Sequence, residues 1–158
     1  MEQNSSIRTN CCSLDAGARM KYPLLSLCVV GIVVSSLALR EHYRTEGFAP
    51  CDINEKWDCG IVNQSPYAMI GKIPVAVIGI AGYLLMGALA FWRAYRLLLA
   101  PVLFGLGFSL YLAHIEKDIL GVWCVYCVIS LATISLLTLL VLGTVLTLWR
   151  RHRSTVSA

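Results

Sequence analysis

The sequence contains little charge, since Asp, Glu, Lys and Arg together make up 14% of its 158 residues while hydrophobic residues make up 58%. That composition excludes an ordinary soluble domain, in which about 25% of residues are charged. Charge is absent from four apolar runs, and a helix needs roughly 20 apolar residues to cross a membrane. The runs are Tyr22–Leu39, Ile73–Trp92, Leu97–Ile115 and Ile119–Trp149. The sequence therefore predicts an integral membrane protein.

The apolar runs also lack the polar and apolar alternation of membrane β-strands, which excludes a barrel. Because lipid offers no partners to free backbone groups, helices are the remaining structure. We expect an all-α, four-helix membrane bundle over residues 22–149, with helices at about 22–39, 73–92, 97–115 and 125–149. Residues 40–72 then form a long outer loop, residues 1–21 an N-terminal tail and residues 150–158 a basic C-terminal tail.

Basic residues are unevenly divided between the two ends of these helices. With the N-terminus inside, the inner segments hold eight Lys and Arg residues and the outer segments hold five. Since basic loops stay on the cytoplasmic side, this count places both termini in the cytoplasm and the loop 40–72 outside. We expect a bacterial inner membrane with the outer side facing the periplasm. The alternative is an endoplasmic reticulum membrane.

Seven cysteines divide between the two sides of the membrane. Cys11 and Cys12 fall in the inner tail, where we expect reduced thiols on a disordered segment, and Cys28 lies within the first helix as a packing residue. The other four lie on the outer side, where disulfides persist. These are Cys51, Cys59, Cys124 and Cys127.

The four outer cysteines form two pairs of different kinds. Cys51 and Cys59 flank "DINEKWD" in the outer loop, which can move, whereas Cys124 and Cys127 open the fourth helix as "CVYC". At about 1.5 Å per residue, Cys127 lies roughly 33 Å from Trp149, beside the edge of a hydrocarbon core about 30 Å thick. A three-residue spacing puts both sulfurs on one helix face. Two such pairs can relay electrons by disulfide exchange, from a water-soluble dithiol to a carrier dissolved in the membrane.

Motifs for other electron carriers are absent. The sequence has no nucleotide-binding glycine motif and no haem-attachment pattern, which favours a quinone as the acceptor. Two alternatives remain open. The outer cysteines could hold a metal together with His114, although their spacing fits zinc sites poorly. They could also form inert structural disulfides, although a bridge within one helical turn removes little chain entropy.

Several motifs in order along the chain carry a resemblance to a known family. They are "CDINEKWDC" in the outer loop, "NQS" before the second helix, "SLYLA" in the third helix and "CVYC" at the start of the fourth. In this order the sequence resembles the vitamin K epoxide reductase family. Quinone-linked oxidases of the DsbB type are similar in plan, but they carry the two pairs in the reverse order.

The resemblance implies a role for each outer residue. Cys51 would meet a reduced partner, Cys59 would exchange with Cys124, and Cys127 would face the quinone ring. Asn63 is similar to the family's Asn that hydrogen-bonds a quinone oxygen.

The resemblance also implies a function and its partners. We expect a thiol oxidase that reduces a membrane quinone (ubiquinone, menaquinone or vitamin K) and supports disulfide formation, without a metal. Reduction of vitamin K epoxide on the same scaffold and a non-catalytic tetraspan protein are the alternatives. Bacterial relatives often carry a fused thioredoxin-like domain, and we expect none here because the chain ends at Ala158. The partner is then a separate thioredoxin-like or DsbA-like protein, and no nucleic acid is expected.

Overall fold

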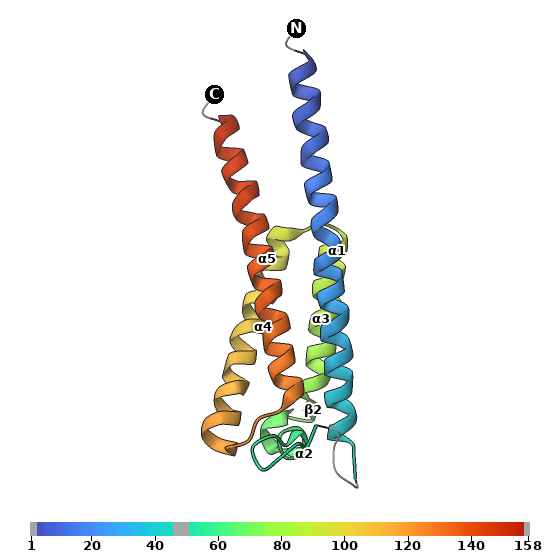
Figure 1. The fold of residues 1–158 in the computed structure, drawn as a ribbon, viewed down its shortest axis with the longest axis vertical. Coiled ribbons are helices and arrows are strands. Elements are labelled where there is room, and N and C mark those ends of the chain that lie inside the picture. Colours follow the sequence, from blue (N-terminus) through green and yellow to red (C-terminus); the bar gives the residue numbers. More distant parts are fainter. Residues whose placement is uncertain (1–2, 46–50, 157–158) are drawn as a thin grey trace.

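A computed structural model of the chain describes residues 3–45 and 51–156, and four long helices dominate this part. They are α1 (Gln3–His42), α3 (Val75–Phe91), α4 (Tyr95–Ile115) and α5 (Val125–Val156). The helices run side by side as a bundle, in which α1 and α5 extend well beyond the other two (Figure 1). The described ends of α1 and α5 lie at the same end of the bundle, opposite α2. The predicted all-α membrane bundle is confirmed.

The chain between α1 and α3 folds over one end of the bundle. It contains α2 (Cys59–Gln64), the 3-10 turn η1 (Pro66–Ala68), and the strands β1 (Met69–Ile70) and β2 (Ile73–Pro74). The two strands form a minimal antiparallel hairpin. Gly71 turns this hairpin with a φ of 65°, a left-handed conformation that glycine adopts at little cost. The long outer loop therefore has short structure of its own.

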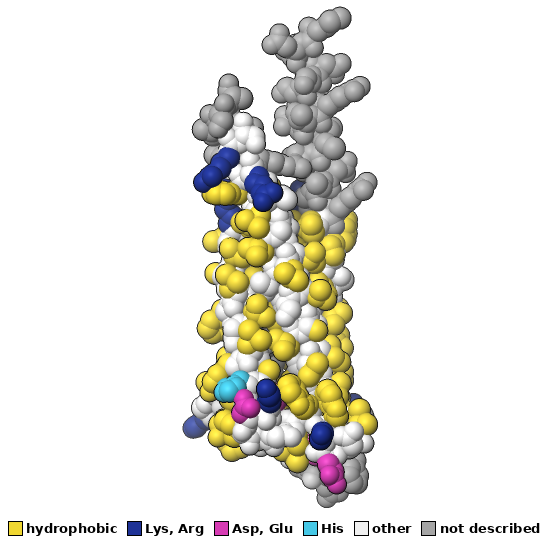
Figure 2. Space-filling view, turned by 60° about the vertical axis from the view of Figure 1, so that its left-hand side comes forward, with side chains coloured by type: hydrophobic (Ala, Val, Ile, Leu, Met, Phe, Trp, Pro, Cys, Tyr) yellow, Lys and Arg dark blue, Asp and Glu magenta, His cyan; other side chains and the backbone are white. Residues whose placement is uncertain are grey.

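The helices are long and apolar enough to span a membrane. In the described part of the chain, three candidate spans cover Met20–His42, Tyr95–Leu120 and Val125–Arg150, and α3 is a shorter apolar helix of 17 residues. Since spanning helices range from about 17 to 25 residues, α3 is at the lower limit. In Figure 2, hydrophobic side chains cover the middle of the visible face, whereas Lys, Arg, Asp, Glu and His gather toward its two ends. This distribution suits a bundle whose middle faces lipid.

The first helix is longer than the sequence predicts. The disorder expected around Cys11 and Cys12 is wrong, because α1 begins at Gln3 and includes both positions. No proline precedes Pro23, so no residue before it removes a backbone donor from the helix. Helix α5 likewise continues past Trp149 to Val156.

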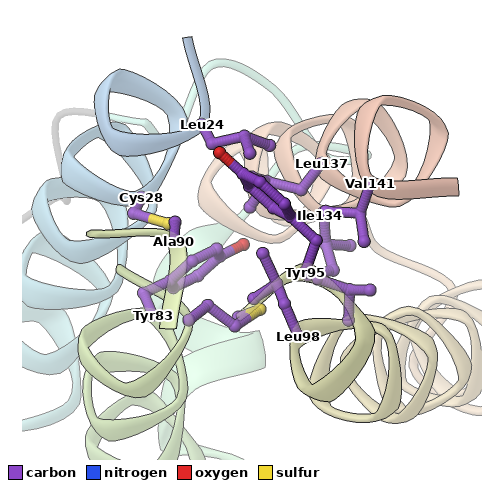
Figure 3. Packing of buried hydrophobic residues seen from close by; sticks show 11 residues of the cluster. Leu24, Cys28, Tyr83, Ala90, Tyr95, Leu98, Ile134, Leu137 and Val141 are labelled. Atoms are coloured by element: carbon purple, nitrogen blue, oxygen red, sulfur yellow. The ribbon is translucent and has the colours of Figure 1, made fainter. Parts of the chain in front are cut away.

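Buried hydrophobic residues from the four long helices pack together between the helices (Figure 3). Leu24 of α1, Leu98 of α4 and Leu137 of α5 are each at most 1% exposed. Cys28 belongs to this cluster at 2% exposed, as a packing role requires. This packing holds the helices together, and a second buried cluster, which contains the outer cysteines, lies toward the end of the bundle that carries α2.

Candidate functional site

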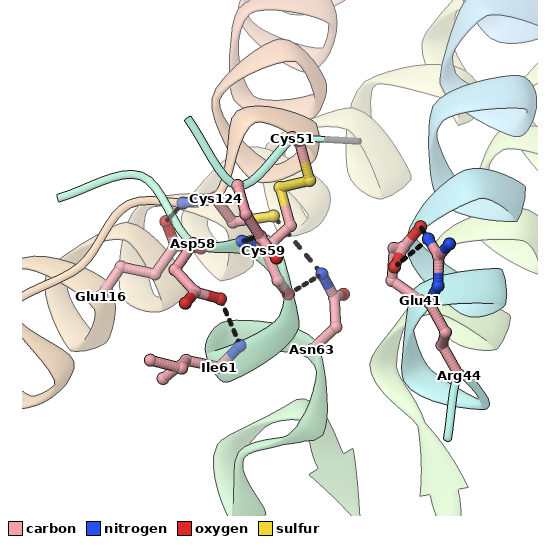
Figure 4. Close-up of a disulfide and its surroundings, with 10 residues drawn as sticks. Glu41, Arg44, Cys51, Asp58, Cys59, Ile61, Asn63, Glu116 and Cys124 are labelled. Atoms are coloured by element: carbon pink, nitrogen blue, oxygen red, sulfur yellow. Dashed lines mark hydrogen bonds and ion pairs between the residues drawn. A yellow bond between two sulfur atoms is a disulfide. The ribbon is translucent and has the colours of Figure 1, made fainter. Parts of the chain in front are cut away.

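The loop cysteines are joined to each other. Cys51 and Cys59 form a disulfide with their Cα atoms 5.9 Å apart, a normal separation for such a bridge. Both are buried, with 6% and 0% of their surface exposed. Figure 4 shows the bridge at the end of the bundle, above α2 and next to Cys124. The first outer pair is therefore an enclosed disulfide on the connection between α1 and α3.

Two aspartates hold Cys59 at the start of α2. Asp58 is the N-cap residue, and its side chain accepts a hydrogen bond of 2.8 Å from the Ile61 backbone amide. Asp52 accepts a hydrogen bond of 3.0 Å from the Cys59 amide itself. Capping aspartates of this kind satisfy amides that lack a partner inside the helix. The "CD…DC" pattern thus has a local structural role in placing the Cys59 sulfur.

The loop is tied to the segment that precedes the second cysteine pair. The Trp123 amide donates to the Lys56 carbonyl over 2.8 Å, and the Asp58 amide donates to the Trp123 carbonyl over 3.1 Å. These bonds form a parallel bridge between Trp57 and Trp123. Because Trp123 adjoins Cys124, the bridge sets the disulfide and Cys124 beside each other.

Cys124 is fully buried in the same cluster as the disulfide. The Asn63 side-chain nitrogen donates to the Cys59 carbonyl over 2.8 Å and to the Cys124 sulfur over 3.4 Å. A hydrogen bond with the Cys127 thiol lowers the pKa of Cys124 below its ordinary value of 9.0, and the Asn63 amide acts in the same direction. Burial and the Glu116 carboxylate oppose this shift of the pKa. The contacts therefore favour a thiolate at Cys124, next to a disulfide.

Cys127 lies one turn further along, in the first turn of α5. It is half-buried, and Cys124 and Cys127 are both free thiols in this structure. The Cys127 residue lines a cavity of about 280 Å³. The second outer pair thus has one member against the disulfide and the other against a cavity.

The cavity is apolar and its wall comes from all four long helices and α2. Its volume is close to the lower end of the roughly 300–1,000 Å³ that small-molecule pockets occupy. The hydroxyl of Tyr83 on α3 hydrogen-bonds the Ser130 hydroxyl and carbonyl on α5, at 3.0 and 3.2 Å. Asn63 lies at the outer end with a buried side chain. A flat apolar ligand with a few polar atoms suits such a wall.

Sequence reasoning missed Glu116, His42 and Tyr83, which also line the cavity. The His42 ring nitrogen Nδ1 hydrogen-bonds the Asn63 backbone carbonyl, so α1 supports the loop from the other side. Glu116 is an acidic residue directly after an apolar run, and this is the one signal that could have drawn attention to it. The sequence does not show that its side chain turns inward.

The metal alternative finds no support in the part of the chain that the structure describes. No group of three His, Cys, Asp or Glu residues lies together there as a metal site would require. His114 is exposed and its Nδ1 lies 2.6 Å from an Asp118 oxygen. This histidine therefore contacts its own helix end and not the outer cysteines.

A membrane bundle with a buried disulfide, a neighbouring thiol pair and an apolar cavity at one end is the arrangement of a membrane thiol oxidoreductase. A comparison with family models matches residues 22–142 to the vitamin K epoxide reductase family, and the chain belongs to this family. The match covers most of the chain, including all four outer cysteines. Members of the family are membrane oxidoreductases that generally use quinones and thioredoxin-like partners. A search of curated proteins finds no match.

Proposed function

We propose that this protein oxidises the dithiol of a thioredoxin-like or DsbA-like partner and reduces a membrane quinone. The observation that carries the proposal is the packing of the Cys51–Cys59 disulfide against Cys124 in one buried cluster, with Cys127 on the cavity wall. Structural bridges alone would not require a second pair of free thiols at this place. Electrons could therefore pass through four sulfur atoms, from the disulfide of the outer loop to a molecule bound in the apolar cavity.

The electrons move by two thiol exchanges and one reduction. A partner thiolate attacks the Cys51–Cys59 bridge and leaves as a disulfide, so both loop cysteines become reduced. Cys59 then attacks a Cys124–Cys127 disulfide, and the loop bridge reforms while Cys124 and Cys127 become thiols. These thiols pass two electrons and two protons to the quinone and become a disulfide again. In this scheme, the form with Cys51–Cys59 joined and Cys124 and Cys127 free is the one that reduces the quinone.

The cavity is the proposed quinone site. Asn63 lies at its outer end, where its amide can reach a quinone oxygen after exchanging its present contacts with Cys59 and Cys124. We propose ubiquinone or menaquinone as the acceptor, and no metal takes part.

The proposed orientation follows from the basic residues and the helix ends. Both termini would lie in the cytoplasm, because the described ends of α1 and α5 are together and the basic count favours that side. The cysteines would then face the oxidising compartment, which is the periplasm if the membrane is a bacterial inner membrane, or the lumen if it is the endoplasmic reticulum.

Turnover with a defined partner tests the proposal. The purified full chain in detergent is supplied with a reduced thioredoxin-like protein and either ubiquinone or menaquinone, and quinone reduction is followed by absorbance. We expect turnover in the wild type and none in Cys127→Ala, whereas Cys28→Ala, which alters a cysteine outside the site, should stay active. Undiminished turnover in Cys127→Ala would reject the relay.

The same preparation distinguishes the alternatives. Vitamin K epoxide replaces the quinone in a parallel assay. If the protein reduces the epoxide and does not reduce ubiquinone or menaquinone, the result favours epoxide reduction as its activity. A non-catalytic protein would oxidise no partner with either acceptor. Its bridge would also resist reduction by glutathione, whereas a relay bridge exchanges readily.

A further inference from the structure

Glu116 is a buried carboxylate that contacts the second cysteine pair. It opens η2 (Glu116–Leu120), a single π-helical turn that follows α4, and such turns are frequent at functional sites. The side chain is 2% exposed. Its Oε2 accepts a hydrogen bond of 3.1 Å from the Cys124 amide, and Figure 4 shows the carboxylate directed at Cys124. One of its two oxygens therefore braces the start of the thiol pair.

The second oxygen has no such partner. Among the described residues, Glu116 Oε1 is the one buried side-chain nitrogen or oxygen without a hydrogen bond. Burying a carboxylate oxygen unsatisfied is costly, so a protein that tolerates it has a reason to keep it. Bracing the Cys124 amide is not a sufficient reason, because a neutral glutamine oxygen would accept the same bond.

The neighbour with a transferable proton is the Cys127 thiol, which interacts with the Glu116 carboxylate. Glu116 and Cys127 both line the cavity. The carboxylate thus interacts with the Cys127 thiol, and both residues border the space in which a quinone would bind. A group in this position can take a proton from one and give it to the other.

We propose that Glu116 is the proton carrier of quinone reduction, accepting the Cys127 thiol proton and passing it to a quinone oxygen. This inference rests on the proposed function. The Cys127 S–H bond breaks and its proton goes to Glu116. The two sulfurs then supply two electron pairs: one pair forms the Cys124–Cys127 bond and the other pair goes to the quinone. The quinone takes the Glu116 proton on one oxygen. The Cys124 proton is released to water, and an equivalent proton from water reaches the other oxygen.

Other charged groups lie around this carboxylate without facing the cavity in the same way. On its own turn Lys117 and Asp118 are exposed, and Asp118 contacts His114. From the α1 side, His42 lines the cavity but contacts the Asn63 carbonyl. Glu116 is therefore the carboxylate placed to serve Cys127, and Asp118→Asn is a matched control on the same turn.

Single-turnover reduction separates this role from a structural one. The full chain is reduced to the Cys124–Cys127 dithiol, mixed anaerobically with ubiquinone, and followed by absorbance from pH 5 to 9. Glu116→Gln keeps an acceptor for the Cys124 amide but carries no proton. We expect the quinone step to slow about 10²- to 10⁴-fold, the range for lost acid–base catalysis. Glu116→Asp should keep part of the rate, and Asp118→Asn should keep all of it.

The partner half-reaction is measured in parallel without quinone. Starting from the form with both outer cysteine pairs oxidised, Glu116→Gln should oxidise two equivalents of partner dithiol at the wild-type rate, which also shows that it is folded. If Glu116→Gln reduces the quinone at the wild-type rate, the inference is wrong and the proposed function still stands. Equal slowing of both half-reactions would also overturn the inference, because it would indicate a structural role. An inert wild type would instead refute the proposed function.

Discussion

The side-chain amide of Asn63 donates a hydrogen bond to the Cys124 sulfur across 61 residues of sequence. The same nitrogen holds the Cys59 carbonyl, so one side chain connects the loop disulfide to the thiol of the second pair. Asn63 is itself fixed, since its carbonyl contacts the His42 ring. The loop, α1 and the start of α5 are thus coupled at a single buried residue.

This contact predicts the acid–base behaviour of Cys124. Hydrogen bonds from Cys127 and Asn63 lower the pKa of Cys124, so its thiolate forms at lower pH than the ordinary value of 9.0 allows. Asn63→Ala removes a bond that favours the thiolate, so the pKa should rise and iodoacetamide alkylation at pH 7 should slow several-fold. Alkylation at Cys124 is followed from pH 5 to 10 by fragment mass spectrometry.

The control for this titration is Asn54→Ala, which alters an exposed asparagine of the same loop. It should leave the alkylation profile of Cys124 unchanged. An Asn63→Ala profile identical to the wild-type profile would show that the amide does not act on the sulfur.

The shared cluster predicts which sulfurs can bond across it. Cys59 and Cys124 are both fully buried beside Asn63. The double variant Cys51→Ala/Cys127→Ala leaves these two as the outer cysteines. Under mild oxidation with oxidised glutathione, most molecules of this variant should form a Cys59–Cys124 bridge. Peptide mapping without reduction identifies the bridge. The matched variant Cys59→Ala/Cys127→Ala leaves Cys51 and Cys124, and it should bridge much less. Equal bridging in both variants would contradict Cys59 as the exchanging residue.

Most of the fold could be predicted from the sequence, because the physical signal is local. The uncharged runs predict the helices, and helix starts at residues 75, 95 and 125 lie close to the expected 73, 97 and 125. The positions of the cysteines also predict Cys51 and Cys59 as one pair, but the contact of Trp123 with Lys56 and Asp58 depends on how distant segments meet. Whether a polar side chain turns inward, as that of Glu116 does, is decided by tertiary packing.

The arrangement of the helix ends predicts a labelling pattern across the membrane. Lys56 and Ser154 are both exposed. Lys56 lies just before α2 and Ser154 in the last turn of α5, and Figure 1 shows α2 and the described end of α5 at opposite ends of the bundle. In a background with Cys11→Ser and Cys12→Ser, a membrane-impermeant maleimide should label Lys56→Cys in intact spheroplasts and Ser154→Cys only after permeabilisation. Labelling of both positions from outside would contradict the proposed orientation.

The close approach of α1 to α3 predicts how the cavity wall responds to one added methyl group. A Cβ at Gly31 would overlap the Tyr83 ring, whose hydroxyl is held by Ser130 on α5. Since overpacking a core costs about 1–3 kcal/mol, Gly31→Ala should unfold at lower temperature in detergent and bind quinone more weakly. Gly107→Ala is the matched control, because no atom lies within 4 Å of its added Cβ.

If the Tyr83 ring is the cause, then removing it should relieve the strain of the extra methyl group. Tyr83→Leu alone should destabilise the protein, since a buried ring and its hydrogen bond are lost. The double variant Gly31→Ala/Tyr83→Leu should lose less stability than the two single variants lose when their losses are added, because contacting residues couple. Thermal unfolding of the four proteins gives the coupling. Two outcomes would show that Tyr83 can move aside and that this contact does not shape the cavity. One is a double variant whose loss of stability equals the sum of the single losses, and the other is a Gly31→Ala variant as stable as Gly107→Ala.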